Sequence, residues 1–386
     1  MEVKAAMSQN MAYRDGGVGV AVVTLDGELE EKLLLHDDGA PPPPVRRHER
    51  AAPQKYQRDD RRHRRPTEGG GDDVDDYRER FVRAYDRLRD ELVSDDACEL
   101  TDDAKRWLAQ MIDYNVPGGK LNRGLSVIDS YLLLKEGREV TEDEFFLACV
   151  LGWCVEWVGL RGINDGILLK CHITRLIKKY FREKPCYIDL NELWNEIALQ
   201  TSLGQMLDLI SIHNGADNLA KYNIKGYRRI VKYKTSYYSF YLPVACALLL
   251  SGAKLENFSG LRDILVEMGI YFQAQDDYLD CFADPNTIGK IGTDIEDHKC
   301  SWLIVQALGH ADRNQIEVLH NYYGKKDSSS VSKVKSTYTA LDLKDIFSEF
   351  EDRAFKHLVT SIEAQQDRAV QEILKSFLKK IYRRKK

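Results

Sequence analysis

The sequence lacks the patterns that identify several classes of protein. Its eight cysteines include no C-x-x-C pair, which argues against a zinc site and against a disulfide framework. No apolar run reaches the roughly 18 residues that a membrane-spanning helix needs. The start, Met1-Glu-Val-Lys4, has the character of neither a secretory signal nor a transit peptide. We therefore expect reduced thiols, no membrane span and a cytoplasmic location.

An excess of positive charge is missing as well. The 386 residues carry a formal net charge of −5, so we expect no wholesale binding of nucleic acid. The basic run Arg61 to Arg65 has two interpretations, a nuclear-import or nucleic-acid patch and a solvated linker. Its acidic neighbours Asp59, Asp60 and Glu68 dilute the positive charge and favour the linker.

The first 75 residues have too little apolar surface to form a packed domain. They include four consecutive prolines, Pro41 to Pro44, and three consecutive glycines, Gly69 to Gly71. A segment of this composition cannot offset the entropy that is lost on ordering. We expect residues 1–75 to be a disordered, low-complexity extension and residues 76–386 to form one helical domain.

From Tyr77 onward the apolar residues recur at helical spacing. Phe81, Tyr85, Leu88 and Leu92 lie three or four residues apart, as on one face of an amphipathic helix. Strand patterns are weak. Further helices are expected at 102–114, 163–182, 190–212, 227–251, 258–283, 296–309, 313–323, 340–360 and 364–382. The sequence therefore predicts an all-α, many-helix bundle.

Two helix starts carry the pattern of a capping box, in which the first and fourth residues bond each other's backbone through their side chains. Thr141-Glu-Asp-Glu144 fits this pattern, and Asp189-Leu-Asn-Glu192 resembles it. The stretch after Thr141, from Phe145 to Val158, is apolar nearly all round. A helix of this kind belongs at the centre of a bundle.

Three carboxylates, Asp276, Asp277 and Asp280, lie in an otherwise apolar stretch. In a helix, Asp276 and Asp280 share a face one turn apart. One interpretation is a Mg²⁺ site, because Mg²⁺ is commonly held by one or two carboxylates together with substrate phosphates. The other is a solvated acidic helix end before Pro285. An EF-hand is excluded, since its sixth position would be Cys281 rather than glycine.

Cationic side chains stand in four other segments. Gly118-Gly-Lys-Leu-Asn-Arg-Gly124 places Lys120 and Arg123 on a glycine-flanked turn, where the backbone can approach an anion. Each segment has an ordinary explanation as a turn, a surface lysine or a charged helix end. Together with a Mg²⁺ cluster they indicate a diphosphate site, because a highly charged phosphate needs distributed neutralisation. No P-loop sequence occurs. The remaining three segments are Lys234-Thr235, residues 289–300 with Lys290, Asp294 and Lys299, and the basic end Ile381 to Lys386.

These motifs resemble the trans-isoprenyl diphosphate synthases, the polyprenyl synthetase family, and among them the farnesyl diphosphate synthases of plants. The resemblance runs from about Tyr77 to Lys386. It implies an all-α bundle of the isoprenoid-synthase type around a deep central cleft, usually as a homodimer. The segments that carry it are residues 118–124, Gln205 to Asp208, Tyr233 to Pro243, Tyr271 to Asp280, Gly289 to Asp294 and the Arg/Lys-rich end.

The resemblance also implies a reaction. Family members condense isopentenyl diphosphate with an allylic diphosphate, dimethylallyl or geranyl, by ionisation, condensation and proton loss in isoprenoid biosynthesis, with Mg²⁺ as cofactor. By position, the implied site residues are Lys120, Arg123 and Arg384 for isopentenyl diphosphate, Lys234 and Lys299 for the allylic diphosphate, Thr235 and Gln273 for steadying the carbocation, Lys290 nearby, Asp208 near the substrate tails, and Asp276, Asp277 and Asp280 for Mg²⁺.

One motif of the family is missing. Members carry a first D-D-x-x-D motif followed by an arginine pair, which should come shortly after Trp157. Here Val158 runs directly into Gly159, and about thirty residues, roughly eight helical turns, are absent. The resemblance implies that ligands of two of three Mg²⁺ ions are lost, together with arginines that grip isopentenyl diphosphate and an aromatic pair that limits product length. Neither Arg161 nor Asp165 is spaced to replace them.

Three hypotheses follow for function. The chain is a prenyltransferase whose sequence lost a segment through alternative splicing or an imperfect gene model, or a catalytically silent homologue that binds diphosphate or pairs with an active subunit, or an unstable product. Because metal ions stabilise the charge on the leaving diphosphate, we expect condensation to be slowed by several orders of magnitude. The shortened core helix also leaves a cavity or forces repacking.

Overall fold

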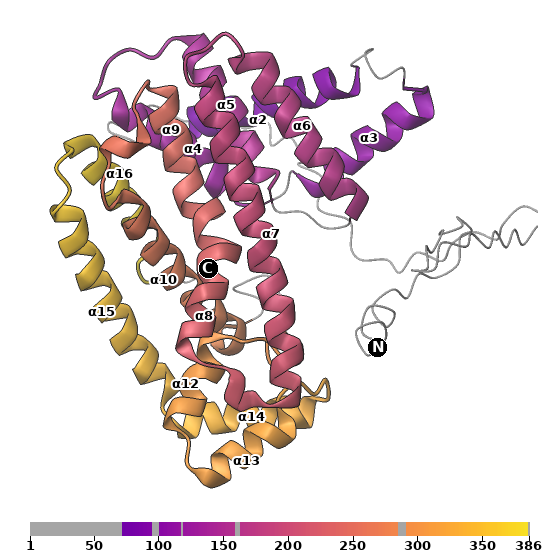
Figure 1. Cartoon of the computed structure of the whole chain (residues 1–386), viewed down its shortest axis with the longest axis vertical. Coiled ribbons are helices and arrows are strands. Elements are labelled where there is room, and N and C mark those ends of the chain that lie inside the picture. The colour runs from indigo at the N-terminus through magenta and orange to yellow at the C-terminus, as the bar shows by residue number, and fades with distance from the viewer. Residues whose placement is uncertain (1–71, 95–99, 117–118, 159–162, 285–290, 385–386) are drawn as a thin grey trace, which may run out of the picture. The chain divides into compact units, whose positions relative to one another are not determined.

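The computed structural model describes residues 72–94, 100–116, 119–158, 163–284 and 291–384 (Figure 1). All of these residues belong to one compact unit of the chain, His63–Lys386. This part of the chain folds into helices joined by turns and contains no strand, which confirms the all-α prediction. None of its helices is both long enough and apolar enough to cross a membrane.

The predicted disordered extension lies for the most part outside the described residues and stays a prediction. Its last residues are helical, since α2 runs from Asp72 to Val93. The amphipathic face predicted for this helix is buried, because Phe81, Tyr85, Leu88 and Leu92 all belong to the core.

The other helices follow in order along the chain, with short connections between most of them. Their bounds are α3 Asp102–Asn115, α4 Asn122–Leu134, α5 Glu142–Glu156, α6 Ile163–Phe181, α7 Tyr187–Asp217, η2 Leu219–Lys221, α8 Ile224–Val231, η3 Lys232–Tyr241, α9 Leu242–Leu250, η4 Leu255–Asn257, α10 Leu261–Phe282, α12 Trp302–His310, α13 Arg313–Tyr322, α14 Ser328–Ala340, α15 Leu343–Glu363 and α16 Arg368–Ile381.

The sequence prediction omits two of these α-helices, α4 and α14, besides the short helices η2 and η4. Helix α14 is rich in serine and carries few apolar residues, so its periodicity is faint. It forms because Asp327 caps its start, where the side chain accepts a hydrogen bond from Ser330 N at 2.9 Å. Its apolar residues Val334 and Tyr338 are fully buried. One cap and a narrow apolar stripe are therefore enough for a helix within a packed fold.

The capping box predicted at Thr141 is confirmed. Thr141 Oγ1 accepts a hydrogen bond from Glu144 N (3.2 Å), and Glu144 Oε2 accepts one from Thr141 N (3.0 Å). The box predicted at Asp189 is wrong, because α7 begins at Tyr187 without a side-chain cap. Asp189 lies in the first helical turn, where its negative charge interacts favourably with the helix dipole.

Helix α5 lies in the core of the bundle, as its apolar sequence predicts. Residues 148–155 are all buried. Trp153 stacks on Phe81 of α2, with ring centroids 4.3 Å apart, and its Nε1 donates to the Phe81 carbonyl oxygen at 2.8 Å. A Cβ on Gly152 would lie 2.8 Å from the carbonyl oxygen of Gly124 in α4. Small residues at this crossing therefore let α4 and α5 pack closely.

A π-helical segment, η3, joins α8 to α9 where the sequence predicts one continuous α-helix. π-helices are rare and frequently mark functional sites. The segment packs against both α7 and α10. A Cβ on Gly204 of α7 would lie 2.5 Å from the Tyr233 carbonyl carbon, and one on Gly269 of α10 would lie 2.6 Å from Ser236 Cα. The two glycines allow this close approach, which fixes η3 between two long helices.

Candidate active site

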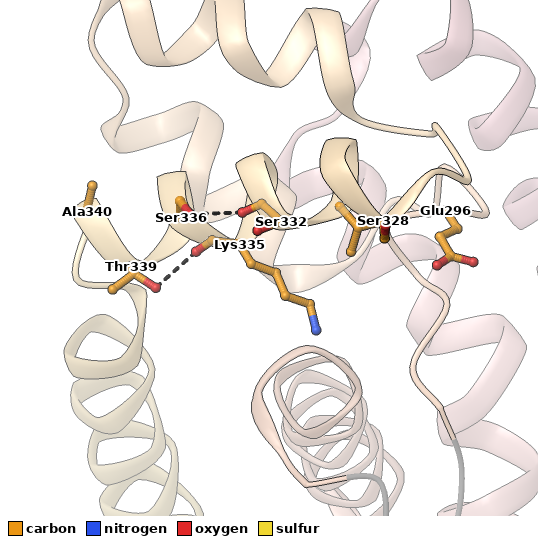
Figure 2. A pocket seen from close by; sticks show the side chains of 8 residues that line it. Glu296, Ser328, Ser332, Lys335, Ser336, Thr339 and Ala340 are labelled. Carbon is orange, nitrogen blue, oxygen red and sulfur yellow. Dashed lines mark hydrogen bonds between the residues drawn. The ribbon is translucent and has the colours of Figure 1, made fainter.

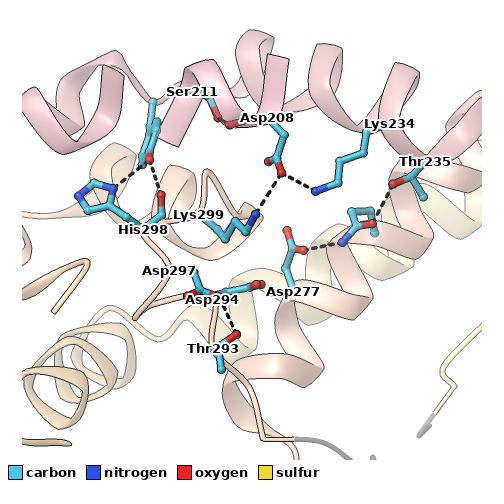
Figure 3. Close-up of polar contacts among 12 residues, drawn as sticks. Asp208, Ser211, Lys234, Thr235, Asp277, Thr293, Asp294, Asp297, His298 and Lys299 are labelled. Carbon is cyan, nitrogen blue, oxygen red and sulfur yellow. Dashed lines mark hydrogen bonds and ion pairs between the residues drawn. The ribbon is translucent and has the colours of Figure 1, made fainter. Parts of the chain in front are cut away.

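Asp208 of α7 accepts hydrogen bonds from two lysines. Lys234 Nζ, from η3, lies 2.6 Å from Asp208 Oδ2, and Lys299 Nζ, from the loop before α12, lies 3.1 Å from the same oxygen (Figure 3). The side chain of Asp208 is 9% exposed, whereas each lysine side chain is 29% exposed. One carboxylate cannot neutralise two ammonium groups. The arrangement therefore keeps a positive charge that can bind an anion with several oxygens, such as a diphosphate.

A chain of hydrogen bonds leads from η3 through α10 to α12. Thr235 Oγ1 donates to Gln273 Oε1 at 3.1 Å, and Gln273 Nε2 donates to Asp277 Oδ1 at 2.9 Å. The other carboxylate oxygen, Asp277 Oδ2, accepts a hydrogen bond from Trp302 N at 2.7 Å. Burial raises the pKa of Asp277 to about 6, although these hydrogen bonds favour the charged form. Asp277 is thus a buried anchor between two helices.

The other two carboxylates of the acidic cluster have different surroundings. Asp280 Oδ2 accepts a hydrogen bond from Asp294 N at 3.1 Å, and Asp276 Oδ1 lies 3.5 Å from Arg384 Nη2. They share a face of α10, one turn apart. Within the described residues, no group of three or more His, Cys, Asp or Glu side chains converges to hold a metal ion. The three Mg²⁺ ligands stay a prediction, and the geometry favours Asp276 and Asp280 over Asp277.

Three of the predicted cations line one cavity. Lys120, Arg123 and Arg384 border a space of about 560 Å³, to which Lys380 of α16 adds a fourth positive charge. Phe240, Phe272 and Phe377 form an apolar wall of the same cavity. Cations beside an apolar wall suit an anion that carries a hydrocarbon group.

Arg123 is held between η3 and the end of α5. Its Nε donates to Ser239 Oγ at 3.1 Å, and its Nη2 donates to Tyr238 Oη at 3.2 Å. Its Nη1 lies 3.9 Å from Glu156 Oε2, and Glu156 also accepts a hydrogen bond from Gly124 N at 2.8 Å. Sequence reasoning missed Glu156. The feature that could have revealed it is its position as the one carboxylate in the apolar stretch from Phe145 to Val158.

Arg384 connects the cavity to the acidic cluster. Its Nε donates to Gln275 Oε1 at 3.2 Å, and its guanidinium lies 4.0 Å from the centroid of the Phe272 ring. Burial lowers the pKa of Arg384, while the charge of Asp276 opposes that change. Gln275, which sequence reasoning also missed, donates to the Ile381 carbonyl oxygen at 2.9 Å. It therefore holds the end of α16 against α10 and keeps Arg384 at the site.

Lys335 of α14 is a further cation next to the acidic cluster. Its Nζ donates to the carbonyl oxygen of Cys281, at the end of α10, at 2.8 Å. Lys335 lines a small cavity together with Asp277 and Asp280, and it also lines a surface pocket of about 670 Å³ along α14 (Figure 2). Because the sequence pattern does not predict α14, this contact has no signal in the sequence.

The structure thus gathers most of the predicted site residues into two neighbouring sets. One set is Asp208, Lys234 and Lys299 with the chain that starts at Thr235, and the other surrounds the cavity of Lys120, Arg123 and Arg384. Lys290, Arg161 and Gly159 lie outside the described residues, so their predicted roles and the missing segment stay predictions.

Known proteins resemble this chain over most of its length. The sequence model of the polyprenyl synthetase family matches residues 105–161 and 157–341. Farnesyl pyrophosphate synthase of Panax ginseng is 53% identical over 340 residues, which cover 81% of this chain and 99% of that protein. Farnesyl pyrophosphate synthase 1, mitochondrial, of Arabidopsis thaliana is 52% identical over 340 residues, covering 81% of this chain and 88% of that protein.

Solved structures resemble the fold as well. The T. brucei farnesyl diphosphate synthase complexed with bisphosphonate BPH-722 superposes with a TM-score of 0.75 at 30% sequence identity, covering 80% of this chain and 100% of that chain. The family match spans well over half of the chain, and its two pieces include every described residue of both cation sets except those of the C-terminal helix and Arg384, which follows that helix. The chain therefore belongs to the polyprenyl synthetase family of prenyltransferases.

Proposed function

We propose that this chain is a farnesyl diphosphate synthase-like prenyltransferase, which joins isopentenyl diphosphate to dimethylallyl or geranyl diphosphate in isoprenoid biosynthesis. The observation that carries the proposal is the pair of cation sets around one acidic cluster. Lys234 and Lys299 meet at Asp208, and Arg384 reaches Asp276 from the cavity. Two diphosphate substrates need two separate sets of cations.

The first set holds the allylic diphosphate in this proposal. Lys234 and Lys299 are already placed by Asp208, so they meet the incoming anion with little reorganisation. When the allylic C–O bond breaks, the diphosphate leaves with the electron pair and the carbon keeps a positive charge. In this proposal, the oxygen atoms Thr235 Oγ1 and Gln273 Oε1, which are 3.1 Å apart, lie near that carbon and stabilise its positive charge.

The second set holds isopentenyl diphosphate in the cavity of Lys120, Arg123 and Arg384. The double bond of this substrate attacks the allylic carbon and forms the new C–C bond, and the loss of one proton from the adduct restores a double bond. The aromatic wall of the cavity excludes water, which would otherwise capture the carbocation.

Mg²⁺ is the cofactor that we propose for Asp276 and Asp280. Two carboxylates one turn apart fit an ion that binds one or two carboxylates together with substrate phosphates. Asp277 fits less well, because both of its oxygens accept hydrogen bonds from the protein. When bound, Mg²⁺ stabilises the negative charge on the leaving diphosphate.

We also propose that a segment with the first D-D-x-x-D motif is missing between Val158 and Gly159. The two pieces of the family match meet at residues 157–161, which supports this proposal. The alignment to the P. ginseng protein gives further support: it spans 340 residues, whereas 81% of 386 is about 313, so about 27 positions have no counterpart here. The loss of metal ligands reduces turnover, since removing one contact to a developing charge costs a factor of about 10²–10³.

A turnover assay tests the proposed activity. The purified chain is incubated with Mg²⁺, geranyl diphosphate and labelled isopentenyl diphosphate, and labelled farnesyl diphosphate is measured against the P. ginseng enzyme. We expect product at a rate that is lower by a factor of about 10²–10³ or more. A rate equal to that of the P. ginseng enzyme would contradict the proposal that a segment needed for turnover is missing. No product at any protein concentration favours the second candidate, a silent homologue that binds diphosphate or pairs with an active subunit.

An exposed apolar stripe on α7 supports a subunit partner. Leu199, Leu203, Met206 and Ile210 recur at helical spacing and are between 41% and 56% exposed. Contiguous apolar surface of this kind marks interfaces between proteins. We propose that a second copy of the chain covers the stripe in a homodimer. In the second candidate function, an active homologue takes the place of that copy.

The oligomeric state tests this interface. Light scattering on the wild type should give the mass of a dimer, and L203E should give a monomer because it places a charge in the buried stripe. I224E is the matched control, since Ile224 is also exposed (45%) but lies on α8. A monomeric wild type rules out the homodimer. Co-purification with the P. ginseng enzyme, and a change in its rate, is the result that the silent-partner function requires.

We propose a cytoplasmic location as well. The cysteines of the described residues are all free, as expected where thiols stay reduced. An organelle is the alternative, because the name of one A. thaliana relative includes mitochondrial. A fluorescent fusion to the C-terminus of the full chain decides between them, and signal confined to an organelle would be the contrary result.

A further inference from the structure

Two tyrosine hydroxyls bond consecutive carbonyl groups of the loop that carries Lys299. Tyr222 Oη, from the turn after η2, donates to the His298 carbonyl oxygen at 2.6 Å. Tyr323 Oη, just after α13, donates to the Lys299 carbonyl oxygen at 2.6 Å. Both tyrosines are buried. We call Tyr222 and Tyr323 the tyrosine clamp.

The loop has no regular structure of its own to fix Lys299. Residues 294–298 form turns, the rest of 291–301 is irregular, and His298 has φ +54°, a conformation that residues with a Cβ adopt rarely. Such a conformation persists only where the surroundings hold it. The tyrosine clamp restrains the two peptide groups that flank the Cα of Lys299.

Two glycines make room for the clamp. A Cβ on Gly215 of α7 would overlap the ring of Tyr222, and a Cβ on Gly324 would overlap the ring of His298. Gly324 has φ +82°, which also favours glycine. The ring of His298 lies between the two tyrosine rings, at centroid distances of 5.9 Å from Tyr222 and 5.1 Å from Tyr323. Tyr222 on one side, and Tyr323 with Gly324 on the other, therefore contact His298.

The same loop is tied to the acidic cluster. Lys299 N donates to the Asp294 carbonyl oxygen at 3.0 Å, and Asp294 N donates to Asp280 Oδ2 at 3.1 Å. At the other end of the side chain, Lys299 Nζ reaches Asp208 (Figure 3). The position of the Lys299 backbone therefore decides whether its ammonium group lies between Asp208 and the acidic cluster.

We propose that Tyr222 and Tyr323 are positioning residues, which hold the backbone of Lys299 so that its ammonium group meets the allylic diphosphate. This inference rests on the proposed function of Lys299. Neither tyrosine touches the substrate. Both act through Lys299, so removing either hydroxyl weakens the binding of the allylic diphosphate without removing a charge from the site.

Calorimetric titration of the full chain with geranyl diphosphate and Mg²⁺, without isopentenyl diphosphate, tests the clamp. Y222F and Y323F each keep the ring and lose the hydrogen bonds of the hydroxyl. Tyr222 Oη also contacts His298 Nδ1 at 3.0 Å, and Tyr323 Oη also contacts the Asp294 carbonyl oxygen at 3.4 Å. Each loss is expected to weaken binding about tenfold. K299A should weaken binding at least as much. Adding Y222F to K299A should cause no further loss, because a positioning residue has no effect once the residue it positions is gone.

Y85F is the matched control. Tyr85 is also buried, and its hydroxyl donates to the carboxylate oxygen Asp113 Oδ1 at 2.7 Å between α2 and α3. Y85F therefore also removes a bonded tyrosine hydroxyl, away from the Lys299 loop, and should bind like the wild type. If K299A binds as tightly as the wild type, the role proposed for Lys299 is wrong and the clamp falls with it. If K299A binds weakly while Y222F and Y323F bind normally, only the clamp is wrong.

Hydrogen exchange of the Lys299 amide gives a second readout that needs no ligand. This amide donates to Asp294 within the loop, and it should exchange faster in Y222F and Y323F than in the wild type or Y85F. Unchanged exchange in both variants would overturn the clamp.

Discussion

At the scale of residues, the acidic cluster divides into carboxylates with different tasks. Asp276 and Asp280 share a face of α10, whereas Asp277 is 5% exposed and bonds Gln273 and the first residue of α12. The sequence spacing predicts which of them share a face. It cannot predict the burial of Asp277, because the partner backbone at Trp302 lies 25 residues further along the chain.

The buried carboxyl of Asp277 predicts a dependence of stability on pH. Its folded-state pKa, about 6, lies above the unfolded value of 3.8, so the folded state binds more protons between these pH values. The stabilisation is complete below the lower value and is lost as the pH rises through the upper one. Relative to D277N, the free energy of unfolding of the wild type should fall by about 2 kcal/mol between pH 4 and pH 7.

Urea denaturation at a series of pH values measures this difference. D263N is the control, because Asp263 is exposed in the first turn of the same helix, and its profile should follow that of the wild type. Parallel profiles for D277N and the wild type would show that Asp277 does not titrate in this range.

At the scale of elements, periodicity predicts α2, α10 and α16, because each has apolar residues on a continuous face, whereas a capping box followed by a stretch that is apolar nearly all round predicts α5. It places η3 in one long α-helix, since a π-helical segment has no distinct sequence pattern. What selects the π geometry is the contact of η3 with two neighbouring helices. Those contacts involve Gly204 and Gly269, and a single sequence does not reveal which glycines face a neighbour.

Gly204 tests the importance of this close packing. In G204A the new Cβ would lie 2.5 Å from the Tyr233 carbonyl carbon and 2.6 Å from Lys234 Cα, so one backbone must move. We expect a loss of about 1–3 kcal/mol in the free energy of unfolding and weaker binding of geranyl diphosphate, because Lys234 moves away from Asp208. Denaturation and calorimetric titration measure the two effects.

The control for this change is G309A. Gly309 is also helical, in α12, but a Cβ there would meet nothing within 4 Å. Alanine at such a position should stabilise the chain by about 0.5–1 kcal/mol. Equal effects of G204A and G309A would mean that the packing of α7 on η3 does not constrain the site.

At the scale of the whole molecule, most of the buried polar side-chain atoms that lack a hydrogen-bond partner in the described residues belong to α5 with its C-terminal cap, α6 and α7. Such atoms are costly. Trp157, at the end of α5, and His172, on α6, each carry at least one, and α7 adds Trp194, Gln200 and Thr201. The helices α5 and α6 precede and follow the predicted deletion in the sequence, and α6 packs against both α5 and α7. We propose that the missing segment packs against these helices in a full-length chain.

Restoring the segment is the strongest test of that proposal. The residues of the P. ginseng enzyme that lack a counterpart here, about 27 in number, are inserted between Val158 and Gly159. If their carboxylates complete the metal site, farnesyl diphosphate formation should rise by a factor of about 10²–10³ or more. The matched control carries alanine at the aspartates of the inserted D-D-x-x-D motif. The control should regain stability, because the inserted residues restore the shortened helix, but it should not regain turnover.

An insertion that raises stability and turnover equally in both forms would mean that the gap limits folding alone. An insertion that changes neither stability nor turnover would mean that the chain does not need the inserted residues.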